Sequence, residues 1–513
     1  MRYRDSLYKA FLEEMRKLED FRISHATEHP GVPLERDDPD VRRLVEAMAF
    51  FYARSHVAGL RNIASSHRRI FQQFFPYLMS PLPAMAMIQA LPQGQLADTI
   101  ELPSGTELAV SAEGDKTAIF RTMTDLRIMP LRLRAATMLP LPGAGFRLAL
   151  SFVTPFARSE DIGTLSLYIN HLNDYQASLR LSYLLKKHIR RSFVVFNEKV
   201  NETSKGSSCS ISYGMPLSQE NEEWEHPIHD ERQFFHFPQK NLFMNVKVPN
   251  PPRNWEQFTI CLDLDRSWPK NTTVNETMFQ LFAVPITNMT RSMANPILCD
   301  GLAWRHSISH PNGEGHYALH SVKGVYQAQA GSMIPIRAGI LAGNQGTYEV
   351  ERTRIKDGQM KGYLDLHFPT AFEEPFTVAV DATWYQPWFS EALTQRISIS
   401  PYRRTVSGVS WDIVSSFVPH VESPFEDNLD AFLHLFTLRS KARLHLEDVI
   451  SLLNVLGTVW SSHFRRLQRL IEGLRVEEVP LNKASGSGMM KHVYTVTIKE
   501  FDPILEPLVA EFV

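Results

Sequence analysis

The stretch FFPYLMSPLPAMAMIQ, residues 74–89, lies inside a run from Ile70 to Ala97 that contains no charged side chain. This run is long enough to cross a bilayer as a helix, but it holds four prolines and five glutamines. Proline breaks helical hydrogen bonds, and glutamine amides in hydrocarbon would lack partners, so the composition argues against a membrane span. It predicts instead a helix that ends at Phe75, a proline-stiffened turn and a buried strand from Ala84 to Leu91.

Helical periodicity dominates the sequence before this stretch. Apolar residues recur at helical spacing from Tyr8 until His29-Pro30-Gly31 ends the pattern. A second helix is predicted to begin with Asp38 as its N-cap and Pro39 at its first helical position. Its apolar stripe continues toward Phe74, and Gly59 marks a place where the helix could break.

After Pro83 the apolar period changes from helical spacing to two. Phe146 to Val153 alternates apolar and other residues, as does Leu131-Arg-Leu-Arg, which predicts strands. One helix interrupts this region, with Asp174 as its cap and an apolar face that precedes the basic run KKHIRR at 186–191.

The second half of the chain predicts more sheet and then a helical tail. Residues 197–231 are polar and lack a pattern, which favours a loop or boundary. Short apolar runs such as 258–264 and 376–381 predict a second β-rich region. Residues 448–471 carry helical spacing that Gly473 is expected to stop, and two strands are expected around 485–488.

These elements predict a multi-domain α+β protein with a helical N-terminal region, β-rich modules of mixed and antiparallel sheets, and a helical C-terminal segment. A length of 513 residues favours about three or four modules. The predicted divisions are 1–80 (helical), 81–196 (first β-rich domain with one helix), 197–231 (boundary), 232–401 (second β-rich domain) and 402–513 (α/β).

Charge and cysteine content limit the classes of partner. The 54 basic and 56 acidic residues nearly cancel, so no overall field draws the chain to nucleic acid or to an anionic membrane surface. Three widely spaced cysteines without a C-x-x-C pair argue against a disulfide framework or a zinc ribbon and favour a reducing cytoplasm. The charged N-terminus lacks the pattern of a signal peptide.

Two histidine patterns are the strongest candidates for chemistry. His25-Ala-Thr-Glu28-His29 spells H-x-x-E-H, an inverted zinc-protease motif, but Pro30-Gly31 would place His29 at a fraying helix end. A second group, His306, His310, His316 and His320, surrounds a predicted hairpin turn. Glycine-rich phosphate loops and nucleophile elbows do not occur. We expect no catalytic residue, cofactor or metal, and a zinc metalloenzyme using His25, Glu28 and His29 is a less favoured alternative.

Several blocks occur in the same order as in a known family. They are DPDVRRLVEAMAFFYAR (38–54), FFPYLMSPLPAMAMIQ (74–89), LPSGTEL (102–108), IFRTMTDLRIMPLRL (119–133), ERQFFHFPQKNLFMNV (231–246), MFQLFAVPITN (278–288) and WDIVSSFVPH (411–420). These blocks, in their sequence, order and wide distribution, resemble those of the TssF (VasA/ImpG) family of type VI secretion baseplate proteins.

This resemblance implies a structural, non-enzymatic subunit of a baseplate wedge. It implies two TssF-like copies per TssG-like subunit, a TssK-like subunit that links the wedge to the membrane complex, and contacts with the spike hub and with sheath or sheath-initiator proteins. The expected location is the cytoplasm, at the inner face of the inner membrane. A phage-tail-like contractile baseplate is the alternative.

Burial of the charge-free stretch in a core or in a subunit interface follows from its composition. The resemblance implies further that the first two helices bundle with the TssG-like subunit. The expected subunit-interface residues are Phe11, Met15, Leu44, Met48, Phe51, Phe74, Phe75, Pro76, Tyr77, Pro81 and Pro83.

Overall fold

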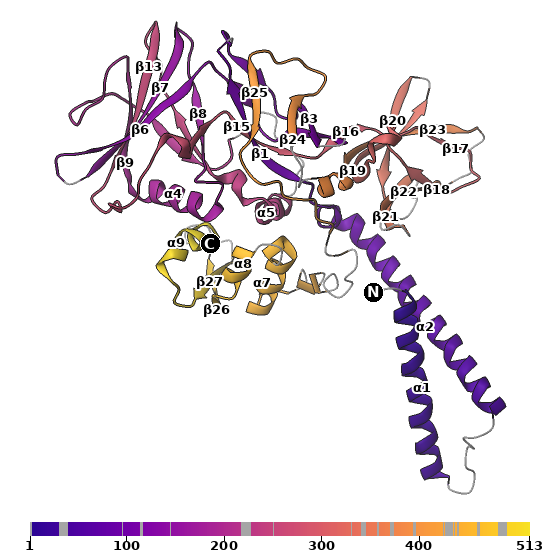
Figure 1. Cartoon of the computed structure of the whole chain (residues 1–513). Coiled ribbons are helices and arrows are strands. Elements are labelled where there is room, and N and C mark those ends of the chain that lie inside the picture. Colours follow the sequence, from indigo (N-terminus) through magenta and orange to yellow (C-terminus); the bar gives the residue numbers. More distant parts are fainter. Residues whose placement is uncertain are drawn as a thin grey trace. The chain divides into compact units, whose positions relative to one another are not determined.

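The computed structural model describes residues 3–29, 39–94, 96–112, 116–143, 145–216, 227–249, 251–329, 331–339, 345–355, 359–369, 374–392, 397–423, 425, 434–435, 437–438, 441–458, 462–480 and 490–512. The chain divides into two compact units, Met1–Pro76 and Tyr77–Val513. Its order of elements is shown in Figure 1.

The first unit is a pair of helices, α1 (Tyr3–Glu28) and α2 (Pro39–Phe74), which lie side by side (Figure 1). Both predicted helices are confirmed, with Pro39 at the start of α2. The expected N-cap Asp38 lies outside the described residues. The predicted break at Gly59 is wrong, because α2 runs through it for 36 residues. One glycine costs a helix only about 1 kcal/mol relative to alanine, which packing against α1 can offset.

The charge-free stretch forms the predicted sequence of helix end, turn and strand. Helix α2 ends at Phe74, a short helical turn α3 (Pro76–Met79) follows, and β1 (Met85–Pro92) begins two residues after Pro83. The side chains from Leu78 to Ile88 are all buried. Among the described residues, no helix is long and apolar enough to span a membrane.

Strand β1 lies inside an antiparallel six-stranded sheet, which explains its burial. The two strands that pair with it have the sequences AVPIT and VSWDI, which contain several β-branched residues. The order is β24 (Ile397–Pro401), β3 (Glu107–Ala112), β4 (Lys116–Thr122), β15 (Ala283–Thr287), β1 and β25 (Val409–Ile413).

Two further antiparallel sheets pack with the six-stranded sheet around the largest apolar core. The five-stranded sheet has the order β10 (Ser207–Ser208), β9 (Ile189–Phe196), β13 (Trp255–Leu264), β7 (Phe146–Arg158) and β6 (Arg132–Pro140). The four-stranded sheet has the order β11 (Ser210–Tyr213), β12 (Phe243–Lys247), β8 (Thr164–Ile169) and β14 (Phe279–Leu281).

These sheets combine strands from both predicted β-rich domains. Strand β13 lies between β9 and β7, and β12 pairs with β8. Residues 81–196 and 232–401 are therefore not separated as the predicted divisions have them. The physical reason is that strand pairing is long-range and leaves no local mark in sequence periodicity.

The remaining large sheet has eight strands and its own apolar core. Its path is β16 (Thr290–Met293), β23 (Phe376–Tyr385), β19 (Ala318–Gln329), β20 (Ser332–Ala338), β21 (Thr347–Arg354), β22 (Met360–His367) and β18 (Arg305–Ile308), with β17 (Ile297–Cys299) beside β23. Strands β20 and β21 are parallel and the other pairs are antiparallel, so this sheet is mixed. The α+β class is confirmed.

Helices α4 (Tyr175–His188) and α5 (Pro227–His236) cover a second apolar cluster in this unit. The predicted cap of α4 is confirmed, since the Asp174 carboxylate accepts a hydrogen bond of 2.7 Å from the Ala177 amide. The end of the basic run, Arg190 and Arg191, belongs to β9 and not to the helix.

The tail is helical, as expected, but the long helix predicted over 448–471 is interrupted. It consists of α7 (Leu446–Leu453), a π-helical turn (Asn454–Thr458) and α8 (Ser462–Gln468). Gly457 has a φ of 129° and supplies the interruption. Gly473 does not end a helix, because it lies inside β26 (Ile471–Pro480), which pairs with β27 (Met490–Ile498) before α9 (Glu506–Phe512).

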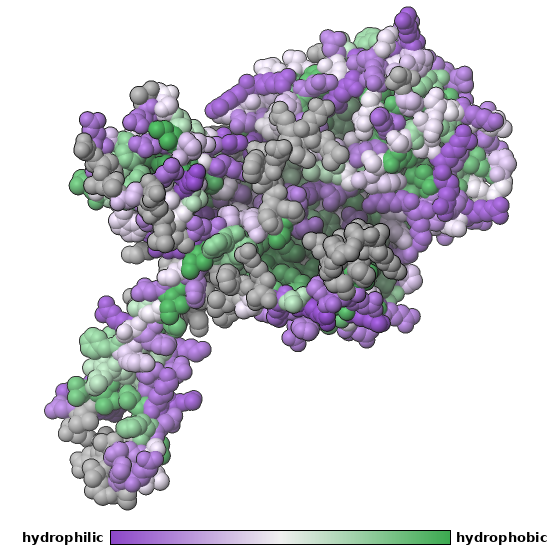
Figure 2. Space-filling view, turned by 180° about the vertical axis from the view of Figure 1, so that it is seen from behind, coloured by the Kyte–Doolittle hydropathy of each residue, from purple (hydrophilic) through white to green (hydrophobic). Residues whose placement is uncertain are grey.

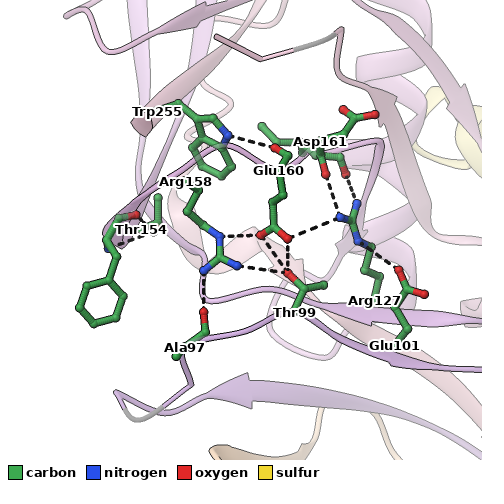
Figure 3. Close-up of polar contacts among 11 residues, drawn as sticks. Ala97, Thr99, Glu101, Arg127, Thr154, Arg158, Glu160, Asp161 and Trp255 are labelled. Atoms are coloured by element: carbon green, nitrogen blue, oxygen red, sulfur yellow. Dashed lines mark hydrogen bonds and ion pairs between the residues drawn. The ribbon is translucent and has the colours of Figure 1, made fainter. Parts of the chain in front are cut away.

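A charged network holds the segment that connects β1 to the strand pair β2 (Ile100–Leu102) and β5 (Leu126–Ile128) (Figure 3). The Glu160 carboxylate accepts from Thr99 at 2.8 Å and pairs with Arg158 at 2.5 Å. Arg127 donates to the carbonyls of Asp161 and Ile162 at 2.8 and 2.9 Å. The turn between β7 and β8 is thereby fixed to β2 and β5.

Candidate partner interface

Helix α2 carries an exposed apolar stripe. Leu44, Met48 and Phe51 are spaced at i, i+4 and i+7, and their exposed fractions are 62, 62 and 64%. The buried apolar residues of α2 lie roughly half a turn away around the helix: Ala49, Ala53, Val57 and Phe71. The helix therefore has two apolar faces, of which only one is used within the unit.

Helix α1 adds further exposed apolar side chains to the same unit. Tyr8 and Phe21 are 63 and 62% exposed, and Leu12 is 49% exposed. Figure 2 shows hydrophobic side chains along the surface of the two-helix unit. Exposed apolar patches that run along an element mark protein-binding surfaces more often than single exposed side chains do.

The eleven expected interface residues fall into three groups. Leu44, Met48, Phe51, Phe74 and Pro76 are exposed, and only the first three share one stripe. Half-buried residues form the second group: Phe11, Met15, Phe75 and Tyr77. Pro81 and Pro83 are buried, so their side chains do not offer a surface to a partner in this structure.

The backbone of Tyr77–Pro83, here called the proline segment, is held in an unusual way. Prolines 81 and 83 lack amide hydrogens and break the ladder of any regular element, yet the buried carbonyls still need donors. All seven carbonyls of the segment accept a hydrogen bond, six of them from side chains. The seventh, at Leu82, accepts from the Val421 amide at 2.9 Å.

Arginine supplies three of these side-chain bonds. Arg232 on α5 is completely buried and donates to the Tyr77 carbonyl at 2.6 Å and to the Ser80 carbonyl at 3.1 Å. Burial lowers the pKa of its guanidinium to about 10. Arg352 on β21 donates to the Met79 carbonyl at 3.1 Å and pairs with Glu422 at 3.2 Å.

Histidine and serine supply the other three. His320 on β19 donates from Nε2 to the Pro81 carbonyl at 3.0 Å, and His236 on α5 donates to the Pro83 carbonyl at the same distance. The Ser423 hydroxyl donates to the Leu78 carbonyl at 2.7 Å. The proline segment is thus fixed by four elements distant in sequence and provides a rigid start to the second unit.

Burial also sets the protonation of these histidines. Desolvation lowers the pKa of His236 to about 4 and holds the pKa of His320 well below its ordinary value. His236 then stays neutral in the folded chain while the unfolded chain takes up this proton near pH 6.5. Between about pH 4 and 6.5 the unfolded state binds more protons, so stability must fall as the pH falls through that range.

We therefore expect His236→Gln, which keeps an amide donor, to reduce the acid sensitivity of the protein. Between pH 7.5 and 4.5 the wild-type chain should lose about 2–3 kcal/mol more free energy of unfolding than the variant does. Urea unfolding at both pH values measures the difference. Equal losses in the two proteins would show that His236 is not held neutral by burial.

Neither histidine pattern assembles a metal site. His25 and His29 lie at the end of α1, with ring centroids 4.9 Å apart. His310 stacks on Tyr317, whereas His320 is buried under the proline segment, so the second group is dispersed. Within the described ranges, no three His, Cys, Asp or Glu side chains are grouped closely enough to hold a metal ion.

Sequence reasoning assigned this role to none of the five side chains that hold the proline segment, and it singled out His320 only as a member of the second histidine group. Arg232 and His236 are the one pair with a local signal, because they occur at i and i+4 within the apolar run RQFFHF. His320, Arg352 and Ser423 have no comparable signal, since they are brought to the segment only by the tertiary fold.

The comparisons with known proteins concern both sequence and fold. The family model described as "Type VI secretion system, TssF" matches residues 4–360. No curated protein matches the chain.

Two solved structures contain a chain with a similar fold. One is the type VI secretion system TssK-TssF-TssG baseplate subcomplex solved by cryo-electron microscopy, with a TM-score of 0.70 and 18% identity over 92% of this chain and 94% of that chain. The other is the baseplate complex from the type VI secretion system, with a TM-score of 0.58 and 17% identity over 98% of this chain and 92% of that chain. At these identities the likeness shows the fold. Because the family model covers well over half of the sequence, the chain belongs to the TssF family of the type VI secretion system.

Proposed function

We propose that the chain is a structural subunit of a type VI secretion baseplate wedge. In this proposal it assembles with TssG-like and TssK-like subunits and with a second copy of itself, around the spike hub, where the wedge nucleates the tube and sheath. Family membership and the fold it shares with baseplate structures support the assignment. The proposed location is the cytoplasmic side of the inner membrane.

The observation that carries the proposal is the exposed stripe of Leu44, Met48 and Phe51 on α2. Each side chain gains about 1.5–3 kcal/mol when it leaves water, so a facing helix from a partner would stabilise the unit. The i, i+4, i+7 spacing fits the packing of helices in a bundle. We assign this stripe to the TssG-like subunit.

A structural role requires no reaction of the chain itself. Energy for contraction can be stored in sheath contacts, and the wedge has only to hold its neighbours and let them rearrange. A zinc enzyme using His25, Glu28 and His29 is the less favoured alternative, and elemental analysis that found stoichiometric zinc would favour it. A phage-tail-like baseplate shares the architecture, but the family match favours secretion.

Co-expression of the chain with the TssG-like and TssK-like subunits of its gene cluster tests this function. We expect a stable complex whose mass by native mass spectrometry corresponds to two copies of this chain per TssG-like subunit. Elution of the chain alone, as a monomer, would contradict the proposal.

A further inference from the structure

A groove of about 780 Å³ lies in the second unit, away from the proline segment. Its walls are α4, the loop 269–273 and the C-terminal α9, and α4 packs directly against α9. Buried apolar side chains form the floor: Leu179, Leu181, Met278, Leu505 and Leu508. This volume and composition suit a short apolar face of a protein segment.

The rim of the groove is cationic. Arg180 and Lys270 are exposed, and the side chain of neither forms a hydrogen bond or ion pair with another described residue. The one carboxylate in the lining, Asp174, already accepts from the Ala177 amide as the cap of α4. The nearby carboxylates of α9, Glu506 and Glu511, pair with Lys187 and Lys186. Two cationic groups are left for a ligand.

The turn that leads into α4 holds an exposed leucine in an unfavourable backbone conformation. Leu172 and Asn173 have φ values of 54 and 57°, in the left-handed region that asparagine tolerates and leucine does not favour. Asn170 exchanges two hydrogen bonds with Asn173 and so holds the turn in place. The Leu172 side chain is nevertheless 89% exposed, so it gains nothing from packing within this chain.

Ile504, which also lines the groove, is 70% exposed, whereas the lining residues Leu505 and Leu508 are buried. The groove thus combines an apolar floor, the exposed Ile504 in its lining and two unpaired cations, and the exposed Leu172 follows the lining residue His171 in sequence.

The turn at Leu172 itself serves this chain, since the Asp174 amide donates to the His171 carbonyl and the His171 amide donates to the Ser178 hydroxyl. The exposed leucine side chain has no such role inside the chain, which is a reason to expect a partner at the site.

From these contacts we infer that the groove binds an acidic amphipathic helix of another protein, whose apolar face covers the floor while its carboxylates pair with Arg180 and Lys270. This inference deepens the proposed function and rests on it in taking the occupant to be another baseplate protein. A second copy of this chain or a basic segment would not fit the assignment.

The test places a photo-crosslinking amino acid at Ile504 in the full chain, in cells that assemble the secretion system, and identifies the crosslinked peptides by mass spectrometry. The expected partner peptide belongs to a different baseplate protein and is acidic and amphipathic. Arg180→Glu with Lys270→Glu should lower the crosslink yield about tenfold or more. The same crosslinker at Phe156, an exposed position on β7, is the control.

A second variant separates binding from folding. Leu172→Asn removes the apolar anchor and relieves the turn, so it should leave the unfolding midpoint unchanged or higher while the crosslink from Ile504 falls about fivefold or more. No crosslink above the Phe156 control, a neutral or basic partner peptide, or a peptide of this chain would overturn the inference. Co-purification of the TssG-like subunit is measured in parallel. If only this inference fails, that subunit is still recovered with the chain. If the proposed function fails, that subunit is lost as well.

Discussion

Replacing both Met48 and Phe51 with aspartate should weaken binding of the TssG-like subunit by about 10³-fold or more. The two side chains are 62 and 64% exposed on the stripe of α2, so the folded unit tolerates polar groups there. In a complex the same positions would be buried, and each substitution would both remove apolar contact and bury a carboxylate without a partner. Co-purification and a titration by biolayer interferometry measure the loss.

The matched control is Arg43→Asp with His56→Asp, which places two carboxylates at exposed positions of α2 that lie about 80–140° around the helix from the stripe residues. We expect helix content by circular dichroism to be the same in both double variants. If both variants bound the TssG-like subunit as tightly as the wild-type chain does, the stripe would not be the interface.

Replacing Arg232 with methionine should destabilise the second unit by about 3–5 kcal/mol. The guanidinium is completely buried, and its bonds to the Tyr77 and Ser80 carbonyls come from a charged donor, which makes each of them stronger than a neutral hydrogen bond. The Ser80 hydroxyl reaches the Tyr77 carbonyl at 3.2 Å and can partly replace one bond. Urea unfolding of the full chain measures the change.

The control is Arg132→Met at the start of β6, where the side chain is exposed and has no partner among the described residues. That change should stay within about 0.5 kcal/mol of wild type. A loss of less than about 1 kcal/mol in Arg232→Met would show that the proline segment does not depend on its arginine donor.

Local sequence signals predicted helices and strands, but they did not predict which strands pair across long separations in sequence. Pro39 at the start of α2, the Asp174 cap and the alternation of 146–153 each follow from the chemistry of neighbouring residues. The position of β1 between β15 and β25 does not, since Ile88 pairs with Val284 and with Ile413. The predicted domain divisions differ from the structure for the same reason.

The sequence likewise predicts only part of the candidate interface. Helical periodicity shows that Leu44, Met48 and Phe51 share one stripe, but only the structure shows that α1 covers the opposite face and leaves this one exposed. Pro81 and Pro83 carry the same apolar signal in the sequence and are buried. Whether an apolar residue faces its own chain or a partner is set by tertiary packing, and composition alone does not reveal it.

In the proposed wedge, the two-helix unit joins the chain to its TssG-like partner. The most direct test of this role compares recovery of that subunit on the full chain and on a chain that lacks residues 1–76, with the unfolding midpoint of the second unit as the control for folding. We predict that the truncated chain keeps its midpoint and recovers none of the TssG-like subunit. Equal recovery on both chains would contradict it.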